Sequence, residues 1–247
     1  MTIKGGPAGS EPAAARDSSD AAPRPWRVER HLGSAATFHG LELRNPVRRL
    51  VWWFEVVRPA IVLGSTQHAD VVDSSRAEAA GVEVVRRRSG GGAVWLASGA
   101  VTWVDVVLPA GDPRWVDDVG RATEWLGRAW VGALEDLGQV GGEVHDGPLV
   151  RSPHSGLVCF AGLAPGEVLL DGRKVVGISQ RRTRAGARFQ CAVLHQWDPR
   201  PMVDLLALRE GERESLVADL ALAATGIGDV PPAEVVAALI ARLRSQA

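Results

Sequence analysis

Arg86-Arg-Arg-Ser-Gly-Gly-Gly-Ala-Val94 is the stretch that decides the fold, because it sets three consecutive glycines between two apolar runs. These runs, residues 82–85 before it and 93–96 at its end, read as β-strands. Glycine loses more backbone entropy on ordering than any other residue, so a glycine triplet between strands is unfavourable by itself. Such a triplet makes sense where a ligand must lie against the backbone. The amides of residues 90–92 can then donate hydrogen bonds to an anion.

Three arginines stand directly before the glycines. Arg86, Arg87 and Arg88 place fixed positive charge and bidentate donors beside the expected anion site. The alternative is that the segment forms the tip of a flexible hairpin, with its arginines in solvent. The flanking strands and the arginines favour the ligand-binding interpretation over the hairpin.

The composition indicates a soluble globular protein without a large excess of positive charge. The chain has 247 residues, enough for one sizeable core or a large domain with a small appendage. Its net charge of −1 means that no global field attracts nucleic acid or a membrane surface, so any anion site must be local. No apolar run reaches the ~20 residues of a membrane span, and the N-terminus lacks the apolar core of a signal peptide. We therefore expect neither nucleic acid nor a membrane as a partner.

Cysteine and lysine are both rare. The two cysteines, Cys159 and Cys191, are too few for a disulfide framework and predict a cytoplasmic location. Of the 28 basic residues only Lys4 and Lys174 are lysine. Arginine would serve on an ordinary surface, so Lys174 is a candidate for a site that needs a compact ammonium group. The alternative is a chance surface lysine.

The apolar pattern predicts the order of the elements. Residues 1–25 are rich in Ala, Gly, Pro and Ser, which predicts a disordered tail. Residues 26–198 read as the main domain and residues 199–247 as a C-terminal helical segment. Short helices are expected at residues 33–43 and 69–80. The expected strands are residues 50–57, 60–63, 82–85, 93–96, 100–108, 167–170, 174–178 and 187–194.

Two further local signals are strong. Asp112-Pro113 has the form of an N-cap followed by a first helical residue, and it predicts a long helix that ends at Gly138. Asp171-Gly172 between two apolar runs predicts a tight hairpin, with Lys174 at the start of the returning strand.

Three segments in this order resemble the lipoate–protein ligase A family, which includes related octanoyltransferases and shares the biotin/lipoate ligase catalytic fold. They are Ile61-Val-Leu-Gly64 with Gln67, the glycine segment Arg86–Val94, and Asp171-Gly-Arg-Lys-Val-Val-Gly-Ile-Ser-Gln180. The resemblance covers about residues 30–200 and implies that residues 26–198 form the catalytic domain. It also implies an α+β fold, in which helices flank a mixed, largely antiparallel central sheet.

The resemblance implies a function in acyl transfer. The glycine segment would cover a lipoyl or octanoyl chain, and Lys174 would contact the acyl carbonyl or acyl-phosphate oxygens. The acceptor would be a lysine of a lipoyl-domain protein, such as the glycine-cleavage H protein or a dehydrogenase E2 subunit. The residues expected to bind the acyl group or a nucleotide are Arg86, Arg87, Ser89, Gly90, Gly91, Gly92, Ala93, Gly177 and Ser179.

Two chemistries are open within this family. Ligases use ATP, with Mg²⁺, to form a lipoyl-adenylate, whereas octanoyltransferases take the chain from an acyl carrier protein onto a cysteine. Cys159 lies fifteen residues before Lys174, the spacing at which these octanoyltransferases carry their nucleophile. A neighbouring ammonium would favour the thiolate. The alternative is a small buried cysteine that packs as an apolar residue.

Several positions depart from the family pattern. Gln190-Cys-Ala192 stands where the family has Gln-His-Gly, unless His195 substitutes, and Leu96-Ala97 replaces a His-Asp pair. His68 stands where asparagine is common, and Glu167 takes the place of the ligase aspartate. These departures leave open an ATP-dependent ligase, a cysteine-dependent transferase and a non-catalytic acyl-binding relative.

Two other possibilities rank lower. A biotin ligase is less favoured, because its glycine loop carries more arginine between the glycines. No metal ion is expected, because the remaining histidines show no metal-ligand spacing. These histidines, read as surface or structural residues, are His31, His39, His145 and His154.

Overall fold

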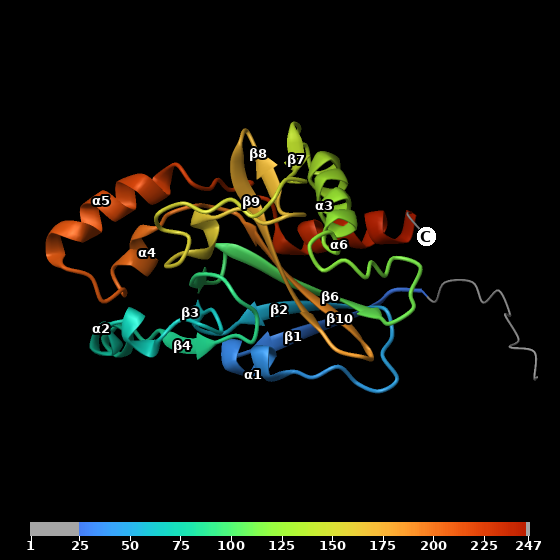
Figure 1. The fold of residues 1–247 in the computed structure, drawn as a ribbon, viewed down its shortest axis with the longest axis horizontal. Helices are drawn as coiled ribbons and strands as arrows, with labels where there is room; N and C mark the ends of the chain where they lie inside the picture. Colours follow the sequence, from blue (N-terminus) through green and yellow to red (C-terminus); the bar gives the residue numbers. More distant parts are fainter. Residues whose placement is uncertain (1–24, 246–247) are drawn as a thin grey trace, which may run out of the picture.

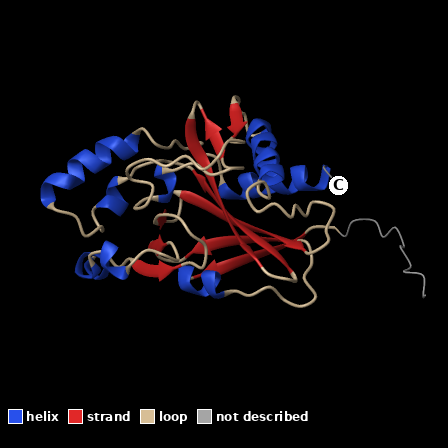
Figure 2. Ribbon diagram, in the orientation of Figure 1, coloured by secondary structure: helices blue, strands red, loops and turns tan. Residues whose placement is uncertain are grey.

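The computed structural model describes residues 25–245 of the chain. The predicted tail, apart from Pro25, lies outside the described residues, as do residues 246 and 247. Helices surround a set of strands that cross the middle of the molecule (Figure 2). Among residues 25–245, none of the helices combines the length and the apolar character that a membrane span requires.

Most of the strands in the described part of the chain belong to one seven-stranded sheet, ordered β1-β2-β6-β10-β9-β8-β7 (Figure 1). β1 and β2 are parallel, and every other neighbouring pair is antiparallel. The prediction of a mixed, largely antiparallel sheet flanked by helices is confirmed. The strands are β1 (Arg27–Gly33), β2 (Leu50–Val56), β6 (Val101–Pro109), β7 (Gly142–Val144), β8 (Val168–Leu170), β9 (Arg173–Arg182) and β10 (Gly186–Leu194).

A second sheet carries the glycine segment. It has the order β4 (Glu83–Arg86), β3 (Ala60–Leu63), β5 (Val94–Leu96), with β4 parallel and β5 antiparallel to β3. The strands before and after the glycines therefore pair with β3 and not with each other. The hairpin alternative is wrong, because the glycine segment has to cross the end of β3.

The helices close the two sheets from outside. α3 (Glu124–Asp136) and α6 (Pro232–Ser245) pack side by side against the large sheet, and both contribute buried residues to its core (Figure 1). α4 (Arg200–Val203) and α5 (Glu210–Ala221) share a core with β3. The remaining helices are α1 (Ala35–Gly40), α2 (Ser74–Ala79), and the 3₁₀ turns η1 (Ala69–Val71) and η2 (Cys159–Ala161).

The predicted start of the long helix is wrong. The carboxylate of Asp112 accepts hydrogen bonds from the Arg49 guanidinium at 2.6 and 2.8 Å and from the Arg114 amide at 3.0 Å. Asp112 therefore closes a turn instead of capping a helix. α3 begins after Thr123, and Gly138, with φ +82°, follows its end as expected.

Other elements differ in detail. The predicted helix 69–80 is two pieces, because Asp73 caps α2 by accepting a hydrogen bond from the Arg76 amide. The predicted strands 50–57 and 60–63 form, but they lie in different sheets. β1 and β7 were not predicted. The hairpin at residues 171–172 is confirmed, with φ of +51° at Asp171 and +72° at Gly172.

Candidate functional site

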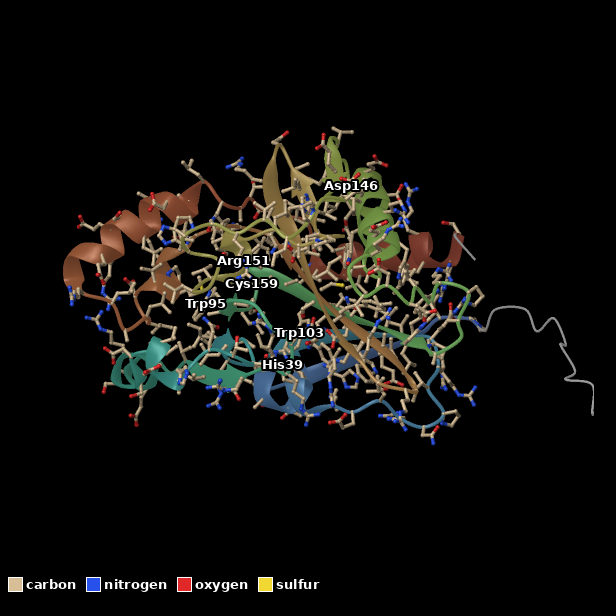
Figure 3. The ribbon with its side chains drawn as sticks, viewed as in Figure 1. His39, Trp95, Trp103, Asp146, Arg151 and Cys159 are labelled. Carbon is tan, nitrogen blue, oxygen red and sulfur yellow. The ribbon has the colours of Figure 1, made fainter. Side chains whose placement is uncertain are left out.

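A cavity of about 440 Å³ receives residues from both sheets and from the glycine segment. Its volume falls in the range of about 300–1,000 Å³ that small-molecule sites occupy. Figure 3 shows Cys159 and Arg151 on one side of this region and His39 and Trp103 on the other. A large part of the wall is apolar, which suits an alkyl chain. The apolar lining includes Val62, Leu96, Trp103, Phe160, Leu163 and Ile178.

Arg87 holds the glycine segment through hydrogen bonds to its backbone carbonyls. It is only 4% exposed, and its Nη1 donates to the carbonyl of Val62 at 3.1 Å. Its Nη2 donates to the carbonyls of Gly90 and Gly92, both at 2.8 Å. Within residues 25–245, the amides of residues 90–92 donate to no protein acceptor. Arg87 therefore occupies carbonyl groups of the segment and leaves its amides available to a ligand.

The glycine segment is also fixed to the turn that carries Cys159. The Ala93 amide donates to the Leu157 carbonyl at 2.8 Å, and the Ala93 carbonyl accepts from the Cys159 amide at 2.9 Å. A Cβ on Gly92 would lie 2.6 Å from the backbone of Val158, so only glycine fits there. Gly91 has φ +96°, a conformation that favours glycine. These contacts explain why this loop needs glycine.

Arg86 and Arg88 lie outside the cavity lining. The Arg86 guanidinium donates to the carbonyls of Ser65 and Gln67, and Arg88 pairs with Glu42 on the surface. Both side chains are thus bound to the protein itself.

The serines of the expected site lie together. The Ser89 hydroxyl lies 3.1 Å from that of Ser179 and donates to Gln190 Oε1 at 3.4 Å. Gly177 and Ser179 both line the cavity.

Lys174 is buried in the cavity wall, at 3% exposure, so the surface alternative is wrong. Its Nζ lies 2.7 Å from Glu167 Oε2, and it donates to the carbonyls of Gly162 at 3.0 Å and Cys159 at 3.2 Å. It also lies 4.9 Å from the centre of the Phe160 ring. The glycine segment and Lys174 therefore line one cavity, but the ammonium is already bound by protein oxygens.

The two cysteines differ in environment. Cys159 is half-buried and lines the cavity, and a Cβ built on Gly91 would lie 3.7 Å from its Sγ. Cys191 also contributes to the lining, but it is fully buried, and burial raises the pKa of its thiol. Cys159 is consequently the thiol that a ligand could reach.

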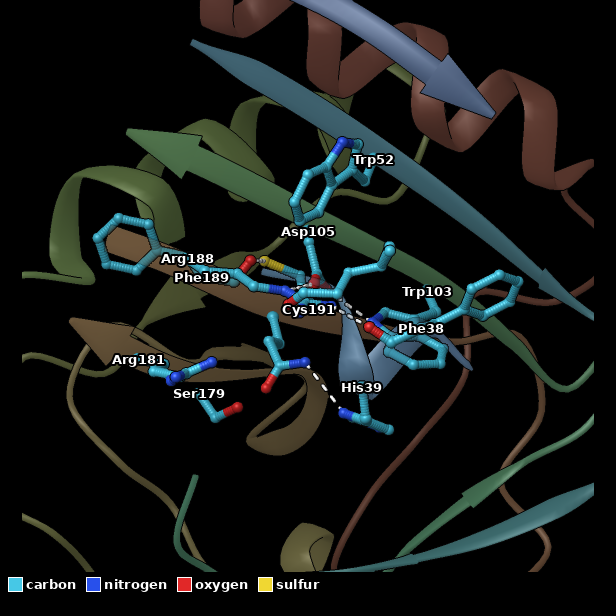
Figure 4. Close-up of polar contacts among 12 residues, drawn as sticks. Phe38, His39, Trp52, Trp103, Asp105, Ser179, Arg181, Arg188, Phe189 and Cys191 are labelled. Carbon is cyan, nitrogen blue, oxygen red and sulfur yellow. Dashed lines mark hydrogen bonds and ion pairs between the residues drawn. The ribbon is translucent and has the colours of Figure 1, made fainter. Parts of the chain in front are cut away.

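His39 belongs to the site although its sequence context gave no signal. It lines the cavity, its ring lies 4.6 Å from that of Trp103, and its Nδ1 accepts from Gln190 Nε2 at 3.2 Å (Figure 4). Burial lowers its pKa from 6.5 to about 3, with smaller contributions from the positive charges of Arg188 and Arg87. His39 is therefore neutral at physiological pH.

A buried ion pair sets the position of His39. The Arg188 guanidinium pairs with the Asp105 carboxylate and donates to the carbonyls of Phe38 and Leu41 at 2.8 Å (Figure 4). This ties the end of α1 to the large sheet. Burial raises the pKa of Asp105, while the pairing with Arg188 opposes that rise.

His195 does not take the place of the missing family histidine in the cavity. It lies outside the lining, where its Nε2 is 2.6 Å from the Thr102 hydroxyl. His68 also lies outside the lining. In the described part of the chain, no group of three or more His, Cys, Asp or Glu side chains could hold a metal ion.

Comparison with known proteins identifies one relative by sequence. An octanoyltransferase, LipM, of Carboxydothermus hydrogenoformans is 33% identical over 152 residues, which cover 61% of this chain and 52% of that protein. The match thus spans about half the length of this curated relative.

Solved structures share the fold. A bipartite lipoate protein ligase of Thermoplasma acidophilum superposes with a TM-score of 0.67 at 18% identity, covering 90% of this chain and 82% of the other. A lipoate-protein ligase A bound with ATP gives a TM-score of 0.63 at 17% identity, covering 90% and 84%. Residues 38–243 match the family described as the lipoyl protein ligase A/B catalytic domain. Since that match covers most of its length, the chain belongs to this family.

Proposed function

We propose that this protein transfers an octanoyl group from a thioester donor, through Cys159, to a lysine of a lipoyl-domain protein. The observation that carries the proposal is the half-buried Cys159 thiol in the wall of a partly apolar cavity, beside Gly91. The named relative, an octanoyltransferase, supports the same chemistry.

The reaction balances without ATP. The Cys159 thiol loses its proton and attacks the thioester carbonyl carbon. A new carbon–sulfur bond forms, the bond to the donor sulfur breaks, and the donor leaves as a thiol that takes up this proton. The acceptor amine then attacks the acyl-Cys159 carbonyl, and the Cys159 thiol is regenerated as the amide forms. Because an amide is more stable than a thioester, the second step is favourable.

The glycine segment would stabilise the oxyanion that forms in each step. Backbone amides fixed before the reaction are efficient oxyanion donors. The amides of residues 90–92 are unpaired within the described protein, and Arg87 and Ala93 fix the segment that carries them. The apolar wall would take the alkyl chain.

The partners follow from the reaction. The donor would be an acyl carrier protein, and the acceptor a lipoyl domain such as the glycine-cleavage H protein or a dehydrogenase E2 subunit. The T. acidophilum ligase was studied with its E2 lipoyl domain, which supports an acceptor of this kind.

An ATP-dependent ligase is the second candidate. The fold resembles that of a ligase bound with ATP and that of T. acidophilum protein Ta0514 with bound lipoic acid. In this version the free amides would bind phosphate oxygens of a lipoyl-adenylate formed with ATP and Mg²⁺, and Cys159 would have no chemical role.

Intact-mass measurement separates these functions. The protein is incubated with octanoyl-acyl carrier protein and no ATP, and then with a lipoyl domain. We expect an octanoyl adduct in the parent and in Cys191→Ser, none in Cys159→Ser, and a modified lipoyl domain. Modification only with free lipoate, ATP and Mg²⁺, retained in Cys159→Ser, would establish the ligase. Tight acyl binding without product in either assay would establish a non-catalytic relative.

A further inference from the structure

The solvent end of the cavity, which we call the mouth, is formed by the exposed residues of its lining. A substrate that comes from solvent to the half-buried Cys159 has to pass between these residues. In the described part of the chain they come from three segments, and Arg151 is the charged residue among them. The exposed lining residues are Thr66, Gly90, Gly91, Leu149, Val150, Arg151 and Gly156.

The guanidinium of Arg151 is free to bind a ligand. The other arginine of the lining, Arg87, donates to backbone carbonyls of the protein. Within residues 25–245, Arg151 pairs with no acidic side chain, and its side chain donates no hydrogen bond to a protein acceptor. The mouth therefore carries a positive charge that the described protein does not neutralise.

The backbone next to Arg151 is fixed although the side chain is free. Val150, directly before it, exchanges two backbone hydrogen bonds with Leu163, at 2.8 and 3.0 Å. Leu163 follows Gly162, which caps the turn η2 that begins with Cys159. Figure 3 shows Arg151 and Cys159 on the same side of the cavity. Arg151 is thus held beside the turn that carries the proposed nucleophile.

The chemistry of a guanidinium at this place favours a phosphate. A guanidinium binds phosphate oxygens through two parallel hydrogen bonds. In an acyl carrier protein the thioester stands at one end of a phosphopantetheine arm, and the phosphate stands at the other end. With the thioester carbon at Cys159, the arm has to leave through the mouth. Its phosphate would then lie at the exposed end of the cavity, where Arg151 is.

Two exposed apolar residues next to Arg151 fit the same arm. Leu149 and Val150 directly precede it, line the cavity, and are 52% and 49% exposed. In phosphopantetheine, a carbon with two methyl groups is separated from the phosphate ester oxygen by one CH₂ group. Covering apolar side chains with these methyl groups is favourable. An apolar pair beside a guanidinium therefore matches a dimethyl carbon beside a phosphate.

We infer that Arg151 binds the phosphate of the phosphopantetheine arm of the thioester donor, while Leu149 and Val150 pack against the dimethyl carbon. This inference rests on the proposed function, because it requires a thioester donor. Arg151 is then a binding residue for the donor and not for the lipoyl-domain acceptor. The phosphates of ATP are the other source of the same chemistry, and the experiment separates the two.

The test removes the phosphate from the donor and the guanidinium from the protein, separately and together. Intact mass follows the acylation of Cys159 by octanoyl-pantetheine and by octanoyl-phosphopantetheine, without an acceptor. We expect the parent to react with the phosphorylated donor with a second-order rate constant that is roughly 5-fold higher, a preference that high salt reduces. Arg151→Gln should lose this preference. Arg184→Gln, exposed and outside the cavity lining, should keep it.

The same variants are then compared with octanoyl-acyl carrier protein as the donor, and we expect Arg151→Gln to slow this acylation as well. Three results would overturn the inference. Equal rate constants for the two small donors in the parent would show that the phosphate is not bound. A preference that persists in Arg151→Gln would assign the phosphate to another cation. Slower transfer to the lipoyl domain with acylation as in the parent would assign Arg151 to the acceptor.

Failure of the proposed function has a different outcome. Octanoyl-pantetheine has no phosphate, so its reaction with Cys159 tests the transfer chemistry without Arg151. If neither small donor nor the carrier protein acylated the parent, the proposed function would be rejected, and this inference with it. A higher KM for ATP in Arg151→Gln, measured as ligation of free lipoate, would then assign the arginine to ATP.

Discussion

Gly64 and Gly91 approach each other so closely that a Cβ on Gly64 would lie 1.8 Å from the Gly91 carbonyl oxygen. Gly64 follows β3, and Gly91 is the middle glycine of the segment that crosses over that end of the strand. This contact therefore fixes the distance between the glycine segment and the end of β3.

Gly64→Ala should displace the glycine segment. We expect it to lower the free energy of unfolding by about 1–3 kcal/mol, the usual range for an overpacked site, and to weaken octanoate binding. Denaturant unfolding and calorimetric titration measure the two effects. Gly211→Ala is the control, because nothing lies within 4 Å of a Cβ there. Unchanged unfolding and binding in Gly64→Ala would show that the segment tolerates displacement.

Arg87→Lys should be far more harmful than Arg88→Lys. Lysine lacks the planar guanidinium group with which Arg87 binds the carbonyls of Val62, Gly90 and Gly92 at the same time. Arg88 makes only a surface pair with Glu42. We expect a loss of about 1.5–3 kcal/mol in the free energy of unfolding for Arg87→Lys. The loss for Arg88→Lys should be much smaller, because solvent screens its surface pair. Urea unfolding of the two variants checks this, and equal losses would contradict a holding role for Arg87.

Native-state alkylation should modify one cysteine. Both cysteines contribute to the cavity lining, but Cys159 is half-buried, whereas Cys191 is fully buried and burial raises the pKa of its thiol. Mass spectrometry after iodoacetamide treatment should place the label on Cys159, with both cysteines modified in denaturant. Octanoate should slow the native reaction if it occupies the cavity. Equal labelling of both thiols in the folded protein would refute this assignment of the accessible thiol.

Acid should destabilise the protein partly through His39. Burial, aided by Arg188 and Arg87, lowers its pKa from 6.5 to about 3, so the folded state keeps it neutral while the unfolded state protonates it. Between those values the unfolded chain binds more protons, and the free energy of unfolding falls as the pH falls. The slope from this group reaches about 1.4 kcal/mol per pH unit.

His39→Gln should remove that contribution. The difference in unfolding free energy between parent and variant is measured by urea unfolding from neutral pH down to about pH 4, so that other titrating groups cancel. We expect this difference to change steadily with pH below about 6.5. A constant difference would show that the pKa of His39 is not lowered in the folded protein.

The glycine segment and Lys174 could be found from the sequence because their signals are local. Three glycines between strands cost backbone entropy, which indicates a ligand or a close backbone contact. A single lysine among many arginines indicates a site that requires an ammonium group. The structure places both on one cavity. The partners of Lys174 could not be predicted in the same way, because the carbonyls of Cys159 and Gly162 depend on how η2 folds.

Elements and site residues set by distant contacts were missed. β1 has no clear apolar alternation and is held by pairing with β2. Asp112 has the sequence of a helix cap, but Arg49, far away in the chain, binds its carboxylate. His39 owes its neutral state to burial in the folded protein and to Arg188 and Arg87, which lie far from it in the sequence.

The use of arginine in place of lysine has a chemical consequence for a protein that would carry an activated acyl group. Thioesters react with amines, and the guanidinium groups on this surface are not amines that such a group can modify. Between residues 25 and 245 the one primary amine is Lys174, which is buried and bound to Glu167. Residues 25–245 therefore carry no exposed amine that an acyl thioester on Cys159 could acylate. An acyl group on Cys159 would then react with the lysine of the partner protein.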